Sequence, residues 1–263
     1  MSLSPEQIQR YGRHLLLKEV GGQGQEKLLA AKALVVGAGG LGAPVLLYLA
    51  AAGIGTLGVV DDDQVDLSNL QRQIIHKTND VGRDKTQSAR EAIIALNPDV
   101  TVNIHTERLT SENAHALISA YDLVADGSDS FETRALVNDA CYEARRPLVS
   151  AAVGQFDGQL SVFKAFETDD KGDPLPCYRC LYPRPPAPGT VPSCAEAGIL
   201  GALSGVMGAW QALEVLKEIL GIGTSPAGRL VLFDGLGVQT RIVKLAPDPE
   251  CRLCGTPQRK SNP

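Results

Sequence analysis

The sequence lacks a long uninterrupted apolar run, a basic tract and an N-terminal segment of the signal-peptide type. Its two longest apolar stretches, residues 41–54 and 199–222, are interrupted by Pro44 or by charged and amide side chains, so neither predicts a membrane span. The formal net charge of −5, without a cluster of Lys and Arg, argues against a nucleic-acid partner. Residues 1–7 contain neither a basic nor an apolar region, so we expect a cytoplasmic protein without a secretory signal.

Cysteine is scarce, with six in 263 residues, and the apolar fraction of 44% is enough to bury a core without disulfides. Four of the six cysteines form a pattern, Cys177-x-x-Cys180 and Cys251-x-x-Cys254. Two such pairs can supply four thiolates to a tetrahedral Zn²⁺ site, which then has no open position for chemistry. We predict a structural zinc site that brings the chain end back to its middle. A pair of redox disulfides is the alternative.

Strand and helix patterns alternate between residues 32 and 152, which predicts a parallel sheet with helices on both faces. After Gly154 the pattern changes, and strands at 159–166, 230–233 and 239–245 predict an antiparallel extension of the sheet. We expect an α/β fold in one domain over residues 1–263. Its halves are 1–154 and 155–263, and the second contains the zinc site and a long proline-rich loop at 167–198. We expect strands at 32–36, 56–60, 100–105, 122–125 and 148–152, and helices at 5–20, 41–52, 83–96, 111–119, 132–145 and 199–220.

A glycine-rich segment, Gly37-Ala38-Gly39-Gly40-Leu41-Gly42, lies directly between an expected strand and an expected helix. Glycines at this place allow a tight turn and let phosphates approach the amides of a helix N-terminus. Asp61 follows the next strand, where a carboxylate commonly binds ribose hydroxyls. The segment predicts a Rossmann-like nucleotide site and by itself favours NAD or FAD slightly over ATP. The alternative is a glycine-rich turn without a ligand.

Three segments after Asp61 contain polar side chains that a dinucleotide dehydrogenase does not obviously need. Asn69 and Arg72 in Ser68-Asn69-Leu70-Gln71-Arg72-Gln73 have the chemistry to bind phosphates, or they lie on a solvated surface helix. Lys85 falls in the first turn of a helix, which suits a cation only if it offsets a bound polyphosphate; otherwise it is a solvated lysine. Asp129 follows a strand and could hold Mg²⁺, although Asp129 or Ser130 could equally cap the next helix.

Two cysteines remain outside the zinc pattern. Cys194 follows the proline-rich loop and precedes a helix, where a thiol has a lowered pKa and becomes a better nucleophile. A buried, inert cysteine is the alternative at this position. Cys141 lies inside an expected helix, and we assign it to the inert class.

Together these motifs resemble the bacterial branch of the ubiquitin-activating-enzyme superfamily, the adenylyltransferases of the MoeB and ThiF type. The resemblance extends over essentially the whole chain, from Arg10-Tyr11-x-Arg13 to the last cysteine pair. It implies ATP with Mg²⁺ rather than NAD, with Asp61 on the ribose and Asp129 on the metal. The residues it places at the nucleotide are Gly37, Gly39, Gly40, Leu41, Gly42, Asp61, Asp63, Asn69, Arg72, Gln73, Lys85 and Asp129.

The resemblance also implies a reaction and partners. ATP adenylates the C-terminal glycine of a small ubiquitin-like sulfur carrier ending in Gly-Gly, before thiocarboxylate formation for molybdopterin, thiamine, tRNA thiolation or cysteine synthesis. Members are homodimers in which the arginine matching Arg13 reaches the partner's ATP site. Cys194 matches a cysteine that links covalently to the carrier in some relatives and is dispensable in others. An NAD-dependent oxidoreductase and a non-catalytic carrier-binding zinc module are the alternatives.

Two departures from the family pattern bear on these expectations. The residue after Asp129 is Ser130, where the family often has asparagine, so we assign Ser130 no nucleotide contact. The proline-rich loop resembles that of longer relatives that continue into a rhodanese domain, whereas this sequence ends soon after Cys254. We therefore expect a separate sulfur donor, a cysteine desulfurase or a rhodanese.

Overall fold

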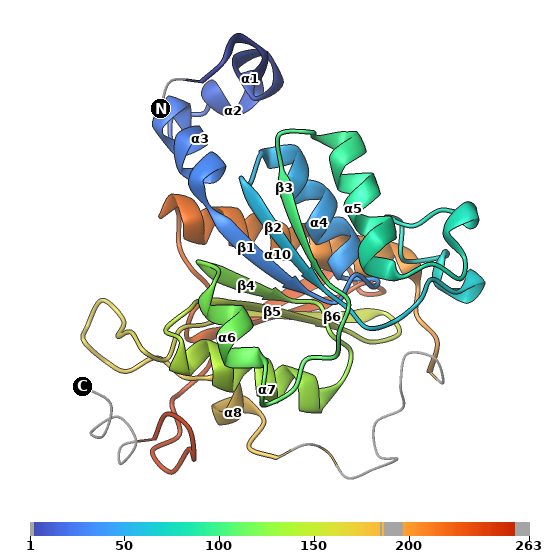
Figure 1. Cartoon of the computed structure of the whole chain (residues 1–263). Helices are drawn as coiled ribbons and strands as arrows, with labels where there is room; N and C mark the ends of the chain where they lie inside the picture. The colour runs from blue at the N-terminus through green and yellow to red at the C-terminus, as the bar shows by residue number, and fades with distance from the viewer. Residues whose placement is uncertain (1–2, 185, 187–196, 256–263) are drawn as a thin grey trace.

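A computed structural model describes residues 3–184, 186 and 197–255. Its centre is an eight-stranded sheet in the order β3-β2-β1-β4-β5-β6-β7-β8 (Figure 1). The first five strands pair in parallel and the last three pair antiparallel, which confirms the predicted α/β class with its antiparallel extension. The strands are β1 (Lys32–Val36), β2 (Thr56–Val60), β3 (Thr101–His105), β4 (Leu123–Asp126), β5 (Leu148–Val153), β6 (Asp157–Phe163), β7 (Arg229–Asp234) and β8 (Gln239–Lys244).

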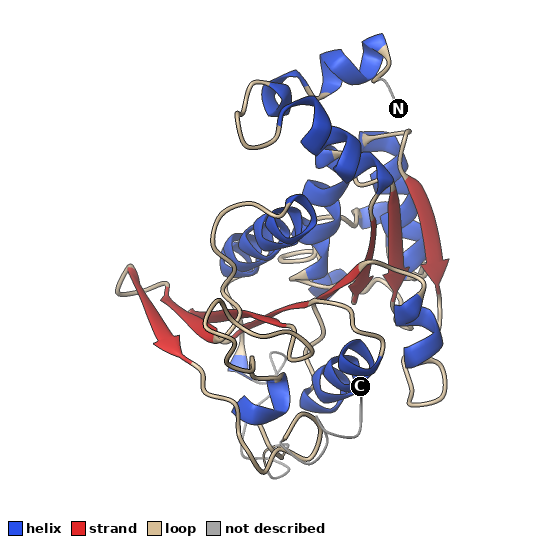
Figure 2. Ribbon diagram, turned by 90° about the vertical axis from the view of Figure 1, so that its left-hand side faces the viewer, coloured by secondary structure: helices blue, strands red, loops and turns tan. Residues whose placement is uncertain are grey.

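Helices cover both faces of the sheet, as predicted (Figure 2). One face packs against α4 (Gly42–Ala52), α5 (Lys85–Leu96) and the long α10 (Gly201–Leu220). The other packs against α6 (Ala114–Ser119) and α7 (Phe131–Glu143). Because the central strands are covered on both sides, they read as continuous apolar runs rather than as an alternation.

The order of the strands creates a switch point beside β1. The chain proceeds from β1 to β2 and β3 on one side, then crosses to β4 and β5 on the other. Ligands of open α/β sheets bind at such a point, at the carboxyl ends of the strands. Three segments meet there: the glycine segment after β1, Asp61 after β2 and the loop between β4 and α7.

The N-terminal region differs from the single helix predicted over residues 5–20. Ser4 is the N-cap with a full capping box, but α1 (Pro5–Arg10) and α2 (Gly12–Leu15) are separate short helices. The glycines expected to end a helix instead begin α3 (Gly21–Ala30). A Cβ at Gly24 would lie 3.0 Å from a Val20 methyl group, so glycine here permits close packing that a propensity argument overlooks.

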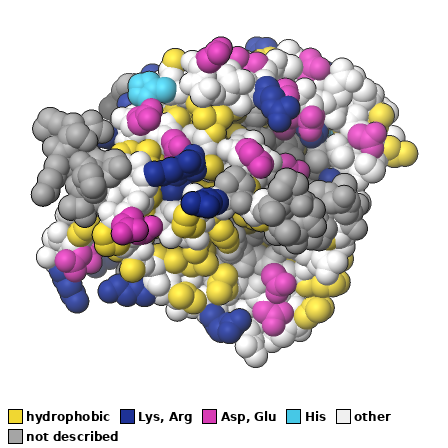
Figure 3. Space-filling model, turned by 90° about the horizontal axis from the view of Figure 1, so that it is seen from below, with side chains coloured by type: hydrophobic (Ala, Val, Ile, Leu, Met, Phe, Trp, Pro, Cys, Tyr) yellow, Lys and Arg dark blue, Asp and Glu magenta, His cyan; other side chains and the backbone are white. Residues whose placement is uncertain are grey.

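The surface gives two further findings. No helix among the described residues is long and apolar enough to cross a membrane. On the face drawn in Figure 3, acidic and basic side chains are intermixed rather than gathered by sign. The hairpin of β7 and β8 extends from the sheet in Figure 2, and every residue of β8 is exposed.

The contact between Tyr11 and Gly53 anchors the N-terminal helices to the core. Gly53 ends α4 at a φ of +82°, and a Cβ there would lie 2.5 Å from the Tyr11 ring. Asn97 completes the contact by donating to the Tyr11 hydroxyl (2.9 Å) and to the Ala50 carbonyl (2.8 Å). Two distant segments are therefore joined at one buried point.

We predict that Gly53→Ala lowers the free energy of unfolding by about 3 kcal/mol, since it combines a left-handed backbone with a steric clash. Gly172→Ala is the matched control. Gly172 has the same φ of +82° and nothing within 4 Å of its would-be Cβ, so only the backbone cost of about 1 kcal/mol applies. Denaturant unfolding measures both variants. Equal losses would contradict the proposed role of the Tyr11 contact.

Candidate functional site

The glycine segment forms a turn that only glycine allows at two of its positions. Gly37 has a φ of +88°, and a Cβ at Gly42 would lie 1.8 Å from the Gly37 carbonyl oxygen. The Asp61 carboxylate supports the turn from β2 by accepting the Ala38 N–H at 2.7 Å. This close turn leads the chain directly from β1 into α4, with the N-terminus of the helix at the switch point.

Lys85 brings a buried positive charge to this end of the sheet. It lies in the first turn of α5, as predicted, although the helix begins at Lys85 itself rather than at Arg83, and its side chain is only 7% exposed. Its Nζ donates to Asp63 Oδ2 at 2.7 Å and lies 4.0 Å from Asp61 Oδ1. The two carboxylates compensate a cation that is otherwise poorly placed at a helix N-terminus. Asp63 is 68% exposed, so it can separate from Lys85 when an anion arrives.

The segment after Asp61 folds over the glycine turn. Leu67–Asn69 form a short 3₁₀ helix capped by Asp66, which brings the residues that follow onto the turn. The would-be Cβ of Gly40 lies 3.5 Å from Arg72 Cγ, and that of Gly39 lies 3.6 Å from Gln73 Nε2. Arg72 is half-buried and donates to the Ser68 carbonyl. The predicted residues Arg72 and Gln73 are therefore brought together with the glycines.

Two buried polar atoms beside the glycines lack partners among the described residues. They are Gln73 Oε1, next to Gly39, and the hydroxyl of Ser204, 3.2 Å from the would-be Cβ of Gly40. Buried polar groups are normally hydrogen-bonded, so orphans at a switch point fit a site that receives a polar ligand. Ser204 lies on α10 and was not among the predicted site residues, because a serine inside a long amphipathic helix gives no sequence signal.

The loop between β4 and α7 closes the other side of the turn. Its Gly127 packs against the glycine segment, with a would-be Cβ 3.0 Å from the Gly42 nitrogen. Of the two predicted capping residues, Ser130 is the N-cap of α7 and accepts the Thr133 N–H at 3.0 Å. Asp129 is exposed, and its side chain is free to face a ligand. On the β2 side of the site, the carboxylates of Asp61, Asp62 and Asp63 lie close together and form an acidic group, which the sequence did not predict as a metal site.

The predicted Arg13 is not part of this arrangement. Arg13 is exposed on α2, and α3 connects that region to the amino end of β1. Figure 1 shows α2 at the opposite end of β1 from the glycine turn, so Arg13 cannot reach the turn of its own chain. Cys194 lies outside the described residues. Cys141 is fully buried as predicted, and burial raises the pKa of its thiol well above the usual range.

The four remaining cysteines form a compact cluster whose ligand atoms lie within 4.8 Å of one another. Three Sγ–Sγ distances are 3.9 Å (Cys177–Cys180), 3.6 Å (Cys177–Cys251) and 3.4 Å (Cys180–Cys254). A tetrahedral Zn²⁺ with Zn–S bonds of about 2.3 Å places its sulfurs about 3.8 Å apart. The cluster fits zinc, whereas a disulfide requires about 2.05 Å between sulfurs. The alternative of two disulfides is therefore not supported.

The cysteine cluster is attached to α7 rather than to the glycine turn. Arg179 pairs through both guanidinium ends with Asp139, and the Tyr178 N–H donates to Asn138 Oδ1 at 2.9 Å. Asp139 lies about 12 Å along α7 from Phe131, the first residue of the helix and the end nearer the glycine turn. Zn²⁺ held by these four thiolates would have no open position for chemistry, so its role would be structural.

Metal content tests the cysteine cluster. We predict about one Zn²⁺ per chain in the purified protein, and loss of that metal in Cys254→Ser. The melting temperature should fall by about 5 °C or more, because the metal joins the chain end to α7. Cys141→Ser is the control that should retain zinc. Stoichiometric zinc in Cys254→Ser would refute the assignment.

Asp126, the last residue of β4, is a buried carboxyl that should make the stability of the fold depend on pH. It is fully buried, its Oδ1 accepts the Ser128 N–H at 3.0 Å, and its Oδ2 has no donor among the described groups. Burial raises the pKa of Asp126, although the nearby Arg134 opposes the effect. A carboxyl whose folded-state pKa is raised stabilises the fold below its ordinary pKa of about 4, and that contribution is lost as the pH rises through the raised value.

We therefore predict that Asp126→Asn is more stable than the wild type at pH 7, and that the difference disappears as the pH falls toward about 4. The amide keeps the Ser128 contact and carries no charge. Exposed Asp129→Asn is the control and should change stability little at either pH. Thermal unfolding of the wild type and both variants between about pH 4 and pH 7 measures these differences. An Asp126→Asn variant that is less stable than the wild type at pH 7 would contradict the prediction.

Comparison with known proteins agrees with this arrangement. The ThiF family matches residues 11–253. A sulfur carrier protein adenylyltransferase of Thermus thermophilus is 50% identical, over 97% of this chain and 93% of its own. The Mycobacterium tuberculosis protein described as a probable adenylyltransferase/sulfurtransferase, MoeZ, is also 50% identical, but the chain covers only 62% of it.

The fold has solved counterparts as well. A crystal structure of E. coli MccB with MccA-N7isoASN matches with a TM-score of 0.80 at 22% identity, over 94% of this chain and 75% of that one. At this identity the likeness concerns the fold alone. The family match and the two 50% identical relatives carry the assignment, and the chain belongs to the ThiF family.

Proposed function

We propose that the chain adenylates the C-terminal glycine of a small ubiquitin-like sulfur carrier with ATP. The observation that carries the proposal is the glycine turn at the switch point, with buried Lys85 and half-buried Arg72 beside it. Two positive side chains at a helix N-terminus suit a triphosphate. The name of the Thermus relative, a sulfur carrier protein adenylyltransferase, supports the choice of substrate.

The reaction needs charge stabilisation rather than proton transfer. A carboxylate oxygen of the carrier attacks the α-phosphorus of ATP, the bond from that phosphorus to the bridging oxygen breaks, and pyrophosphate leaves. The carboxylate is already ionised at neutral pH, so no general base is required. Positioning and electrostatic stabilisation then supply most of the rate. In this proposal, the residues that hold the nucleotide are Gly37, Gly39, Gly40, Leu41, Gly42, Asp61, Asp63, Asn69, Arg72, Gln73, Lys85 and Asp129.

Individual roles follow from the surroundings of each side chain. Lys85 exchanges its exposed partner Asp63 for phosphate oxygens, while buried Asp61 holds the turn and faces the ribose. Arg72, lying against Gly40, neutralises phosphate charge. The exposed Asp129 carboxylate has the hard oxygen donors that suit Mg²⁺. Mg²⁺ bound there would offset charge on the leaving pyrophosphate.

The proposal includes a homodimer. Arg13 belongs to α2, which lies beyond the amino end of β1 and away from the glycine turn of its own chain (Figure 1), so it can serve an ATP site only on a second copy. Apolar side chains near it are exposed, with Leu16 at 76% and Ile8 and Leu17 each at 51%. The N-terminal helices therefore offer an apolar surface next to the arginine, as a dimer contact requires.

The steps after adenylation involve groups beyond the glycine turn. Cys194 is proposed as a thiol that attacks the acyl-adenylate, so that a thioester with the carrier forms and AMP leaves. A separate cysteine desulfurase or rhodanese is proposed as the sulfur donor. The zinc cluster holds the chain end to α7 and takes no part in the chemistry. A reducing compartment such as the cytoplasm suits the described cysteines, none of which forms a disulfide.

Exchange between ATP and labelled pyrophosphate tests the adenylation step. We predict exchange that depends on a carrier ending in Gly-Gly. Arg72→Met or Lys85→Met should lower its rate by on the order of 100-fold, because transition-state charge loses a partner. Arg90→Met, exposed on the same helix as Lys85, is the control and should change little. Lack of exchange with every small ubiquitin-like carrier of the source genome, in zinc-loaded protein, would refute the proposal.

The same assay shows whether Cys194 acts in adenylation or only in the later sulfur-transfer step. Exchange ends at the acyl-adenylate, so Cys194→Ala should retain it and lose thiocarboxylate formation. Survival of both activities would show that the thiol is not a required nucleophile.

Subunit mixing tests the dimer. Arg13→Ala and Lys85→Met chains should each be inactive alone, because each lacks one half of every ATP site. Mixed after dissociation, they should regain about a quarter of the wild-type exchange rate, since half of the dimers are hybrid and each hybrid has one intact site. Mixing that restores nothing, although hybrid dimers form, would contradict the assignment of Arg13 to the partner's site.

A further inference from the structure

His76 is a buried histidine that the proposed reaction does not use. It lies three residues after Gln73 and is 6% exposed. Its Nε2 lies 2.9 Å from the Ala38 carbonyl oxygen in the glycine turn, and its Nδ1 lies 2.8 Å from the Ser88 hydroxyl on α5. The imidazole therefore connects the glycine turn to α5.

Ala38 is held on both sides by side chains from neighbouring segments. Its N–H donates to Asp61 Oδ2 at 2.7 Å, and its carbonyl oxygen accepts from His76. These two contacts fix the peptide groups before and after Ala38. The described peptides are all trans, so the N–H of the Ala38–Gly39 peptide points opposite to the carbonyl that His76 holds.

The peptide that His76 holds carries a free donor. Among the described residues, the N–H groups of Gly39 and Gly40 donate to no other group. They lie just before α4, where unpaired N–H groups and the helix dipole attract anions. The orientation of the Gly39 N–H thus depends on the hydrogen bond between His76 and Ala38.

A carbonyl oxygen can only accept, so the contact requires a proton on His76 Nε2. Burial lowers the pKa of His76, which favours the neutral ring, and Nδ1 can then accept from the Ser88 hydroxyl. If the ring takes up a second proton, Nδ1 donates and the Ser88 proton turns to Asp80 Oδ2, 2.9 Å away. Nε2 carries its proton in both states, so the contact with Ala38 is the same whether the ring is neutral or charged.

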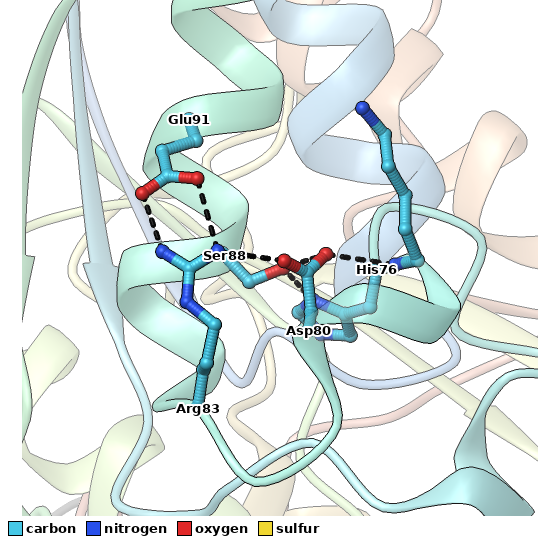
Figure 4. Close-up of polar contacts among 6 residues, drawn as sticks. His76, Asp80, Arg83, Ser88 and Glu91 are labelled. Atoms are coloured by element: carbon cyan, nitrogen blue, oxygen red, sulfur yellow. Dashed lines mark hydrogen bonds and ion pairs between the residues drawn. The ribbon is translucent and has the colours of Figure 1, made fainter.

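Asp80, which contacts His76 through Ser88, is held in place by further hydrogen bonds, as Figure 4 shows. Asp80 Oδ2 also accepts the Lys77 N–H at 2.8 Å, and Asp80 Oδ1 accepts from Arg83 at 2.7 Å. Burial alone would raise the pKa of Asp80, but these hydrogen bonds outweigh it and lower the pKa. Arg83 in turn pairs with Glu91 on α5. The network leaves the ring little freedom to rotate.

We propose that His76 is a positioning residue for phosphate binding, which holds the Ala38 carbonyl so that the Gly39 N–H faces the nucleotide. The inference rests on the proposed function, because it takes the ligand of the glycine turn to be ATP. His76 touches no ligand and acts through the backbone of the turn. It is therefore distinct from the side chains that contact phosphate.

Two matched variants distinguish the contributions of Nδ1 and Nε2 of His76 to ATP binding. The glutamine amide reaches about as far as imidazole Nε2, so His76→Gln keeps a donor for the Ala38 carbonyl and loses the Ser88 contact. The asparagine amide reaches only about as far as Nδ1, so His76→Asn does the reverse. We expect His76→Asn to raise the Kd for ATP about tenfold, the effect of one lost hydrogen bond, and His76→Gln to leave it within about threefold. The Kd for adenosine, which has no phosphate, should not change in either variant.

Equal ATP affinity in His76→Asn and the wild type would overturn the inference. So would equal losses in both variants for ATP and adenosine, which indicate a merely structural role. The Gly39 amide signal in the ligand-free, full-length protein gives a second readout: it should shift in His76→Asn and stay in place in His76→Gln. If the wild type binds no ATP, the proposed function fails, and the Gly39 signal alone decides the inference about His76.

Discussion

The close contact between the Gly37 carbonyl and Gly42 determines how the rest of the site is built. There is no room for a side chain at Gly42, so β1 can turn directly into α4 only with glycine at this position. The turn leaves the N–H groups of Gly39 and Gly40 without a hydrogen-bond acceptor among the described residues, at the switch point of the sheet. Neighbouring segments then contribute according to their place in the strand order: Asp61 from β2 and Gly127 from the end of β4.

The positive charge of Lys85 at the switch point is balanced by carboxylates of the same chain, without a ligand. Lys85 is a buried cation at a helix N-terminus, an arrangement that the helix dipole disfavours, and two aspartates compensate it. One of them is buried and holds the turn, while the other is mostly exposed. A polyphosphate can replace the exposed partner without disturbing the buried one. The site can therefore accept a highly charged substrate with little rearrangement of its core.

Much of this arrangement could be predicted from the sequence because it follows from short, local patterns. Glycine spacing after an apolar strand indicated the turn, the two Cys-x-x-Cys pairs indicated the cluster, and Lys85 was expected in the first turn of its helix. The alternation of strands and helices predicted the sheet class, including the antiparallel strands after Gly154.

The rest depends on tertiary contacts that leave no local signal. Gly24 lies in the first turn of α3 rather than after the end of a helix, because its missing side chain makes room for Val20. Ser204 reaches the turn from a helix far along the sequence, and His76 looks like an ordinary residue of a buried segment. Arg13 illustrates a different limit, since its proposed role lies in a second copy of the chain. Spacing predicts which elements form, but only packing determines which side chains from distant elements meet.

The central claim is that a carrier carboxylate attacks the α-phosphorus of ATP over the glycine turn. The most direct measurement uses a carrier whose C-terminal carboxylate is labelled with ¹⁸O, followed by mass analysis of the AMP released after sulfur transfer. Attack by the carboxylate places one of its oxygens on the phosphorus, so AMP should carry one ¹⁸O atom. AMP without label, from a carrier that has been turned over, would contradict the claim.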